Sequence, residues 1–359
     1  MARPAAASHT IEWVTDGERF AALHDGWEAL TAGDASPFGT HAWFHCWWRA
    51  FGAGSRLRIC AAWRADELAA VLALHERGGL LASMTNYHSP QFRAPARDAR
   101  ALRAVVEAAH VTGAAALALH AVPASDPLLG AVGAVSSRRR RPMVVEGVHV
   151  SPIVDTTGDR AAYVRTHASR RRTQRNKLRR EHAAEFVFDG ALGDLDADLD
   201  RAFAIEAAGW KGRAGTAIVS APETEAFYRA VAHAHRARGE LRLAWLHLDG
   251  RPAAVDLLLQ RHGRLYLLKT GHDEAFASLG AGGVLQLEII EHCFEQGLQA
   301  CELLGDEEPW KRRLATDRRE HVRLWSYRRR PAGLARYAAR RAVVPLVRRA
   351  RDGRSALRR

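Results

Sequence analysis

The segment Lys269–Gly297 reads KTGHDEAFASLGAGGVLQLEIIEHCFEQG and has three glycines within the four positions Gly280–Gly283. An apolar strand is predicted at Leu265–Thr270, and the apolar spacing of Val284–Gln296 predicts a helix. A glycine-rich turn that opens into a helix presents free N–H groups and the positive end of the helix dipole, which together bind phosphate. The pattern predicts either a phosphate-binding turn or a tight loop without a ligand.

Length and composition indicate two globular domains. The 359 residues are 47% apolar and include ten Trp, which suffices for two cores. The sequence has no run of about 18 uncharged apolar residues and no apolar N-terminal segment, so we expect a cytoplasmic protein without a membrane span. The cysteines lack metal-like spacing, so we expect no metal and four reduced thiols, at Cys46, Cys60, Cys293 and Cys301.

The positive charge is concentrated in three places. The net charge is +13, and the segment Arg328–Arg359 alone holds twelve Arg and one Asp. A second cluster spans Arg165–Arg180, and a short run spans Arg138–Arg141. The two larger clusters lack the interleaved aromatic residues that stack on bases, and the sequence has no helix-turn-helix or zinc-finger spacing. Nucleic acid is therefore disfavoured as a partner.

The two halves of the chain predict a similar order of elements. The first half predicts a buried helix at Phe38–Gly52, three strands, a helix near Ala96–His110 and another strand. The second half predicts a basic helix near Arg160–His182, a strand, helices at Leu195–Ala208 and after Pro222, an antiparallel meander of three strands, the glycine turn with its helix, and two more strands. GxGxxG and Walker sequences are absent, so a dinucleotide fold is disfavoured.

Several segments, taken in order, resemble one family. They are PFGTHAWFHCWWRAFG, SRRRTQRNKLRR, GWKGRAGTAI, DGRPAAVDLLLQ and the long segment from LYLLKTGHDEAF to DEEPWKRRLA. Together they resemble the GNAT superfamily of acyl-CoA-dependent acyltransferases, and more narrowly its cellulose-biosynthesis-associated (CelD-like) branch, which is related to the Fem-type peptidyltransferases. The resemblance covers roughly residues 27–325.

The resemblance implies an α/β fold with a mixed α+β sheet, made of tandem GNAT-like acyl-CoA N-acyltransferase domains. The expected domains are a degenerate GNAT-like domain at residues 1–150, the acyltransferase domain at 151–330 and a basic tail at 331–359. We expect acetyl-CoA or another acyl-CoA as the co-substrate.

In the family the acyl-pantetheine lies between two splayed strands, which correspond here to Leu265–Thr270 and Ala300–Gly305. The pyrophosphate lies on the following turn, here Ser278–Gly283, although the family's turn usually starts with Arg or Gln. The residues that the resemblance assigns to the cofactor are Leu268, Lys269, Thr270, Ser278, Leu279, Gly280, Ala281, Gly282 and Gly283.

Acyl transfer from a thioester to an amine needs a base, a polarised carbonyl oxygen and a thiolate that leaves with a proton. The resemblance implies direct attack by the amine, with the backbone N–H of Leu268 or Lys269 polarising the oxygen. Trp310 stands where the family usually has Tyr, so the donor of the last proton stays open.

The acidic turn GDEEPWKRR is expected to supply the base, from Asp306 or else Glu307, while Lys311 and Lys211 orient the acceptor. The alternative is that the acids at 306–308 cap a turn and pair with the cations at 311–313. Asp256, inside the apolar run AAVDLLL, either lines the acceptor cleft or faces solvent. The residues after the fourth strand, His272 and Asp273, and the aromatic Trp210 are further candidates for the cleft.

The tail predicts a basic helix at Arg336–Arg349, interrupted by Pro345. Apolar residues alternate with Arg there, at Leu334, Tyr337, Val343, Val344, Leu346 and Val347. This pattern suits either an anionic membrane surface, with the protein peripheral at the inner membrane face, or a helix packed on its own domain.

The function expected from the sequence is N-acyl transfer from acyl-CoA to a small molecule or to a cell-envelope or exopolysaccharide precursor. One alternative is a Fem-type transferase that uses aminoacyl-tRNA and binds its phosphates through the basic cluster at Arg165–Arg180. Another is a non-catalytic factor in polysaccharide assembly.

Overall fold

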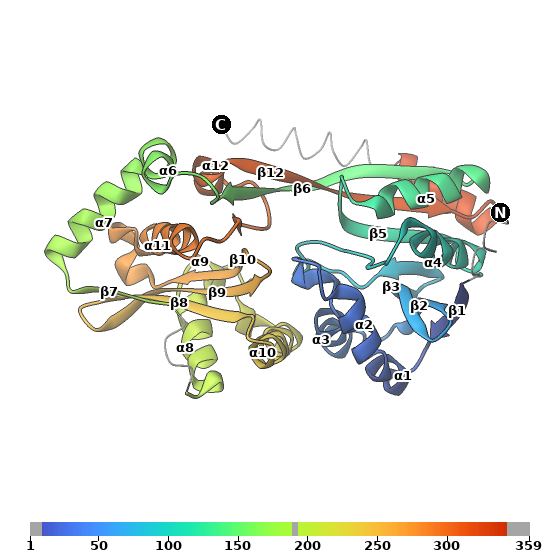
Figure 1. The fold of residues 1–359 in the computed structure, drawn as a ribbon, viewed down its shortest axis with the longest axis horizontal. Coiled ribbons are helices and arrows are strands. Elements are labelled where there is room, and N and C mark those ends of the chain that lie inside the picture. Colours follow the sequence, from blue (N-terminus) through green and yellow to red (C-terminus); the bar gives the residue numbers. More distant parts are fainter. Residues whose placement is uncertain (1–8, 189–192, 343–359) are drawn as a thin grey trace, which may run out of the picture. The chain divides into compact units, whose positions relative to one another are not determined.

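A computed structural model describes residues 9–188 and 193–342 (Figure 1). The chain forms two compact units. Unit 1 contains the residues up to Leu30, Gly54–Val148 and the described residues from Val322 onward, whereas unit 2 contains Thr31–Ala53 and His149–His321. The units therefore interleave along the chain, which differs from the consecutive domains predicted at 1–150, 151–330 and 331–359.

Unit 2 is built on a mixed sheet in the strand order β6-β11-β10-β9-β8-β7. Neighbouring strands are antiparallel except β10 and β11, which are parallel. The strands are β6 (Met143–Asp155), β7 (Ala184–Phe188), β8 (Leu241–Leu248), β9 (Arg251–Arg261), β10 (Arg264–His272) and β11 (Ala300–Glu302). The predicted meander is β8–β10, and both of its two-residue turns, Asp249-Gly250 and His262-Gly263, have the positive φ angles of tight hairpins.

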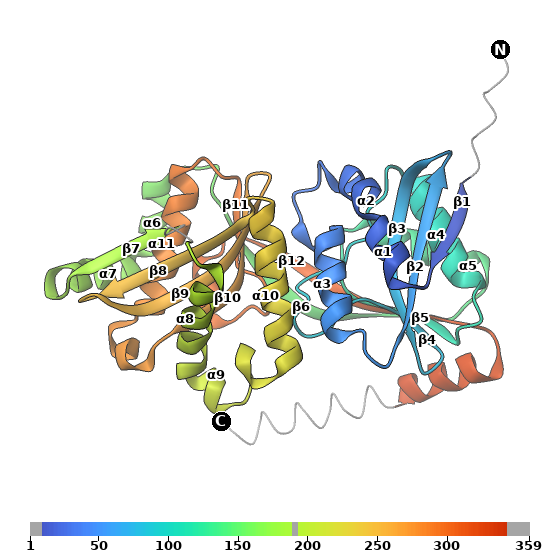
Figure 2. The same cartoon turned by 90° about the horizontal axis from the view of Figure 1, so that it is seen from below.

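Helices cover both faces of this sheet (Figures 1 and 2). On one face α11 (Ala281–Glu295) shares a core with β8, β9 and β10, and α7 (Ser169–Glu181) packs on α11. On the other face lie α8 (Leu195–Ala208) and α10 (Pro222–Ala237), and α3 (His41–Phe51) packs on α10. Shorter helices are α6 (Arg160–His167), α9 (Trp210–Arg213), α12 (Pro309–Leu314), η1 (Pro37–Gly39), η2 (Ile218–Ser220) and η3 (Glu274–Leu279).

Unit 1 has the same topology. Its strand order is β1-β2-β3-β4-β5-β12, with β4 and β5 parallel and the register antiparallel from β1 to β4. The strands are β1 (Thr10–Val14), β2 (Arg56–Arg64), β3 (Glu67–Arg77), β4 (Leu80–Ser83), β5 (Ala116–Pro123) and β12 (Asp317–Tyr327). The helices are α1 (Gly17–Ala22), α2 (His24–Thr31), α4 (Ala99–Val111) and α5 (Pro127–Arg138). The helix between the parallel strands is α4 here and α11 in unit 2.

Two predicted helices differ from the observed ones. The basic helix predicted at 160–182 is two helices, α6 and α7, because the buried Ala168 leaves the helical conformation between them. In the tail, residues 331–342 are helical, and the predicted helical residues from Val343 onward lie outside the described part of the chain.

Within the described ranges, no helix is both long and apolar enough to cross a membrane. All four cysteines are buried, and burial raises the pKa of the Cys46 and Cys60 thiols to about 12. Cys46 and Cys60 are therefore core thiols of low thiolate content.

Candidate active site

Strand β10 has an open edge where β11 ends. The two strands pair only along Arg264–Tyr266, and β11 stops at Glu302. β10 continues to His272 and stays paired with β9 along its other edge. From Leu267 onward, the edge toward β11 has no partner strand in the described part of the chain. Its backbone groups are therefore placed to pair with an extended ligand.

A β-bulge lies where this open edge begins. The register with β9 shifts between Leu267 and Lys269, so Leu268 is an extra residue on β10. A bulge bends its strand and redirects the backbone groups of the extra residue. Of the two residues expected to polarise a thioester, Leu268 is thus the one in the bulge. The Lys269 ammonium lies 4.9 Å from the ring centre of Tyr228 in α10.

The glycine turn ends in a left-handed residue, and α11 begins directly after it. Gly280 has φ 67° and ψ 33°, a conformation that glycine adopts at little cost. The helix begins at Ala281 rather than at Val284, so Gly282 and Gly283 lie in its first turn and not in the loop. No side chain caps this end of α11, and its first N–H groups have no acceptor within the helix.

The equivalent helix of unit 1, α4, is capped. The Asp98 carboxylate accepts hydrogen bonds from the N–H groups of Arg100 and Ala101 at 2.9 and 2.8 Å. A carboxylate there occupies the place of an anionic ligand and repels one. Of these two helices, α11 is the one whose first turn can receive an anion.

Side chains from α7 pack against the glycine turn. A Cβ on Gly280 would lie 1.9 Å from Nε2 of Gln174, which donates to the Leu279 carbonyl at 2.9 Å. A Cβ on Gly283 would lie 3.5 Å from the guanidinium carbon of Arg171. The left-handed conformation of Gly280 therefore favours glycine, and a Cβ there would also displace the Gln174 side chain.

Arg171 places a charge beside the first turn of α11. It donates to the Gly283 carbonyl at 2.9 Å and to Oε1 of Gln286 at 2.8 Å, and its guanidinium lies 5.5 Å from the ring centre of Trp310. Burial lowers its pKa to about 10, so it stays charged at neutral pH. Arg171 belongs to the basic cluster Arg165–Arg180, which the Fem-type alternative assigned to tRNA phosphates, whereas here it donates to residues of α11.

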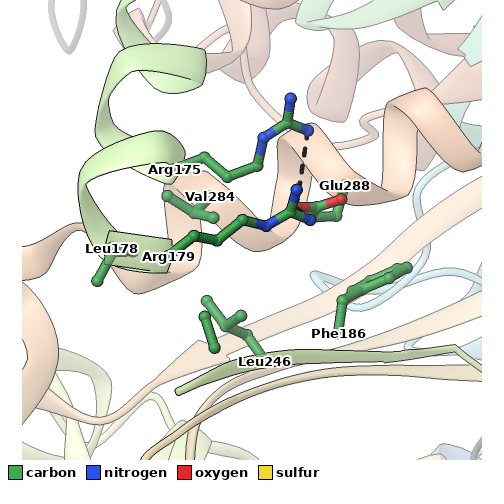
Figure 3. A pocket seen from close by; sticks show the side chains of 8 residues that line it. Arg175, Leu178, Arg179, Phe186, Leu246, Val284 and Glu288 are labelled. Atoms are coloured by element: carbon green, nitrogen blue, oxygen red, sulfur yellow. Dashed lines mark hydrogen bonds and ion pairs between the residues drawn. The ribbon is translucent and has the colours of Figure 1, made fainter. Parts of the chain in front are cut away.

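Two further cations of α7, the largely buried Arg175 and the half-exposed Arg179, hold α7 and α11 together. Arg175 lies 3.6 Å from Glu288 and also pairs with Glu291, and Arg179 lies 2.7 Å from Glu288 (Figure 3). The pocket that these side chains form with β7 and β8 has a volume of about 10 Å³. That is room for one water molecule, so this pocket is too small for a substrate.

Asp256 is buried beneath α11. It is 1% exposed and pairs in register with Thr270 of β10, so both residues share one face of the sheet. Two neighbours of Asp256 on that face, Ala254 and Leu258, belong to the core that contains α11. The Asp256 charge acts on Arg171, where it opposes the lowering of the pKa by burial. The interpretation that Asp256 faces solvent is therefore wrong.

The three acids of the turn after β11 have different surroundings. Glu307 pairs with Arg312 at 3.3 Å, and Glu308 accepts a hydrogen bond from the Trp310 indole at 2.6 Å. Both glutamates pair with the cations at 311–312, as the pairing alternative expects, but Glu308 does not cap α12 with its side chain. Asp306 is exposed, and its carboxylate has no ion pair or hydrogen bond within the described residues.

Lys311 supports the same turn. Its Nζ donates a hydrogen bond to the Leu304 carbonyl at 2.8 Å. The Lys311 side chain is 12% exposed. Leu304 has φ 51°, which is costly for a residue with a branched side chain, and Gly305 follows with φ 60°. Lys311 thus stabilises the turn that presents Asp306. The side chains of Trp210 and Lys211 lie outside what the structure describes.

Two residues at the turn, Gln174 and Gln286, were not predicted. The available signal was the i, i+3 spacing of Arg171 and Gln174, which puts both on one helix face. Among the described residues, no group of three His, Cys, Asp or Glu is placed to bind a metal ion.

Comparison with known families identifies the domain in unit 2. Residues 167–312 match the family model described as "Acetyltransferase (GNAT) domain". This range contains the open strand β10, the glycine turn and α11. The chain therefore has a mixed α/β fold with a GNAT domain, and the comparisons do not distinguish the CelD-like branch. No curated protein sequence matches the chain.

Several solved structures share the fold across both units. FemX has a TM-score of 0.58 at 12% identity, with 88% of this chain and 97% of that chain covered. L-PGS from Bacillus licheniformis has a TM-score of 0.57 at 12% identity, with 90% and 96% covered. The C-terminal domain of a protein assigned as a lysylphosphatidylglycerol synthetase from Agrobacterium fabrum has a TM-score of 0.57 at 13% identity, with 89% and 96% covered. At such identities the likeness shows the fold alone.

Proposed function

We propose that the chain is an acyltransferase whose unit 2 binds acetyl-CoA or a longer acyl-CoA and transfers the acyl group to an amine. One observation carries the proposal: a single unit combines the open, bulged edge of β10 with the uncapped N terminus of α11. The pantetheine arm pairs with the open edge, and the pyrophosphate accepts hydrogen bonds from the first turn of α11. Unit 1 is degenerate in this proposal because Asp98 caps the equivalent helix.

The reaction is a direct transfer. The amine nitrogen attacks the thioester carbon, a C–N bond forms, and the C–S bond breaks to release the thiolate. The N–H of Leu268 donates to the carbonyl oxygen as negative charge develops on it. Asp306 takes the amine proton, because its carboxylate is exposed and makes no ion pair within the described residues, and the thiolate takes a proton from solvent. Asp256 positions Arg171 beside the phosphates.

The proposed acceptor is an amino group on a cell-envelope or exopolysaccharide precursor, which rests on the resemblance to the CelD-like branch. We also propose that the protein works in the cytoplasm, peripherally at the inner membrane face. The described part of the tail helix exposes Leu334 at 43%, but Arg336 donates to the Gly78 carbonyl and Arg340 pairs with Glu146, so it is docked on unit 1. Flotation with anionic vesicles, comparing the full chain with a truncation after Ala342, tests the membrane contact.

The donor is tested by calorimetric titration of CoA and acyl-CoA into the protein and two variants, Gly282→Asp and Gly282→Asn. The helix dipole stabilises an Asp in the first turn, but its negative charge repels phosphate. Asn has nearly the same shape without the charge. We expect binding by the native protein, at least tenfold weaker binding by Gly282→Asp and near-native binding by Gly282→Asn. If the native protein binds no CoA ester, the acyl-CoA proposal is wrong.

A second candidate donor is aminoacyl-tRNA. The outer face of α7 exposes Arg170, Arg172 and Arg180, which make no ion pair within the described residues. The similarity of the fold to FemX is compatible with this donor. Binding of aminoacyl-tRNA that weakens steeply with salt and is lost in Arg170→Gln/Arg172→Gln would favour it. Failure to bind either donor would favour the non-catalytic assembly factor.

A further inference from the structure

Unit 1 contains a cavity with a volume of about 310 Å³ that none of the candidate active-site residues lines. His110 and Val111 contribute to it from the C-terminal end of α4, and Arg139 and Arg141 follow α5. The segment Arg328–Arg330, directly after β12, completes the lining. This volume is large enough for a small ligand or for the head group of a lipid.

The charge of this cavity is uncompensated. Five of its seven lining residues are arginines, and the described residues contribute no carboxylate to it. The nearby Glu107 pairs with Arg138, which does not line the cavity. Burial lowers the pKa of Arg141, and the charges of Arg328 and Arg139 lower it further, so these cations repel one another. An anion in the cavity would relieve this repulsion.

The backbone holds the arginines in place. After α5, the Arg140 and Arg141 N–H groups donate back to the carbonyls of Ser137 and Ser136 at 3.0 and 2.8 Å, which fixes the turn that carries Arg139 and Arg141. The Arg328 N–H donates to the Ala115 carbonyl at 2.8 Å.

Gly333 closes the turn after Arg328–Arg330. A Cβ there would lie 2.2 Å from the Arg328 carbonyl oxygen and 2.8 Å from that of Ala115. The backbone of this segment is therefore packed closely against Ala115, directly before β5, which limits how far it can shift.

The floor of the cavity is neutral. His110 Nε2 lies 3.2 Å from the Ser136 hydroxyl and 3.0 Å from the Ser326 hydroxyl, and burial lowers the His110 pKa to about 4. The positive charge at neutral pH thus comes from the arginines. Arg141 also has a structural role, because it donates to the His110 carbonyl at the end of α4. The side chains of the other four arginines make no such hydrogen bond within the described residues.

We propose that this cavity binds a diphosphate, or another group with adjacent phosphates, as a site separate from the acyl donor. Guanidinium groups match phosphate oxygens in bidentate pairs, and a single phosphate monoester carries only about −1.5 to −2 charges. Five arginines around one cavity therefore suit two neighbouring phosphates better than one carboxylate. The diphosphate belongs either to a soluble molecule or to a lipid head group.

Calorimetric titration with inorganic pyrophosphate at low ionic strength tests this site. The cavity variant is Arg139→Gln/Arg329→Gln, which spares the structural Arg141. The control is Arg56→Gln/Arg103→Gln, which removes the same charge from exposed positions of unit 1 outside the cavity. Repeating the titration in a Gly282→Asp background removes any binding at α11. A second arm measures binding to phosphatidylcholine vesicles with and without diacylglycerol pyrophosphate, whose head group carries two adjacent phosphates.

We expect the cavity to bind pyrophosphate with similar affinity in the native protein, the control and the Gly282→Asp protein, and about tenfold or more weakly in the cavity variant. Vesicle binding that depends on diacylglycerol pyrophosphate and is lost only in the cavity variant would support the site with a lipid source. Equal losses in the cavity variant and the control would show non-specific charge and overturn the proposal. Absence of both kinds of binding would overturn it as well.

Discussion

Asp256 and Asp306 are carboxylates of the same unit in opposite surroundings. Asp256 is buried on the α11 face of the sheet, where it interacts electrostatically with Arg171. Asp306 is exposed on a turn that Lys311 stabilises. A base must reach the acceptor amine and exchange its proton with solvent. This requirement favours Asp306 as the base and gives Asp256 a positioning role.

The first prediction follows from that difference. Asp306→Asn should lower kcat by about 10²–10⁴-fold with little change in the affinity for CoA, because general-base catalysis contributes roughly that factor. Thiol release from acyl-CoA in the presence of amino-sugar acceptors measures it. Glu307→Gln is the matched control, since Glu307 already pairs with Arg312. If Asp306→Asn retains full activity, Asp256 becomes the better candidate.

A second prediction concerns a buried ionic cluster in unit 2. Glu240 lies 2.7 Å from His235 Nδ1 and pairs with Arg261. Burial raises the pKa of Glu240, but hydrogen bonds from His235 and Arg238 and the nearby positive charges outweigh it and hold the pKa at about 2. A lowered folded-state pKa contributes stability above the unfolded value of about 4.3, and this contribution is lost as the pH falls toward 2.

Glu240→Gln should therefore lower the free energy of unfolding by about 3 kcal/mol at pH 7 and by much less below pH ~3. Urea unfolding of both proteins across this pH range measures the difference. The control Glu225→Gln breaks an i, i+4 pair with Arg229 on the surface of α10 and should cost no more than about 0.5 kcal/mol. An equal effect of Glu240→Gln at pH 3 and pH 7 would contradict the assigned pKa.

At the scale of elements, the glycines around the start of α11 have different roles. Gly280 has φ 67°, and a Cβ added there would lie 1.9 Å from Nε2 of Gln174. Gly282 lies in the first helical turn, and its Cβ would make an ordinary contact of 3.5 Å with His272.

The third prediction is that Gly280→Ala lowers the free energy of unfolding by about 1–3 kcal/mol, whereas Gly282→Ala changes it little or raises it by up to about 1 kcal/mol. Chemical denaturation of the two variants beside the native protein tests the pair. Equal destabilisation by both would mean that the left-handed conformation of Gly280 is not what requires glycine.

Elements with a local signal were predictable from the sequence. The Asp249-Gly250 and His262-Gly263 turns separate the apolar runs of β8–β10, and the acids at the start of α8 mark its N terminus. The sequence predicted that α11 begins at Val284, because Gly282 and Gly283 have low helix propensity. The helix begins at Ala281 and includes both glycines. The bulge at Leu268 has no local signal, since it depends on the register with β9. The burial of Asp256 is likewise a property of the packing of α11.

At the scale of the whole molecule, the chain returns to each unit after leaving it. The strands β6 and β12 each change unit along their length, at Val148–His149 and at His321–Val322. Residues 31–53 carry α3 into unit 2, where Phe38 packs on Tyr266 at 5.4 Å and Trp43 packs on Phe227 at 5.2 Å between ring centres. No local sequence pattern marks such exchanges, so the sequence predicted consecutive domains.

The fourth prediction follows from these shared segments. A fragment of residues 151–330 lacks α3, which exposes aromatic residues of α10 and β10, and a fragment of residues 1–150 lacks the part of β12 that pairs with β5. We expect each fragment alone to bind a hydrophobic dye, to lack near-UV circular dichroism and to unfold without a cooperative transition. Co-expression of residues 1–150 with residues 151–359 restores every segment of both units and should recover a soluble complex. A cooperative, dye-free fragment 151–330 would show instead that unit 2 folds without the segment at 31–53, and that α3 adds little to its core.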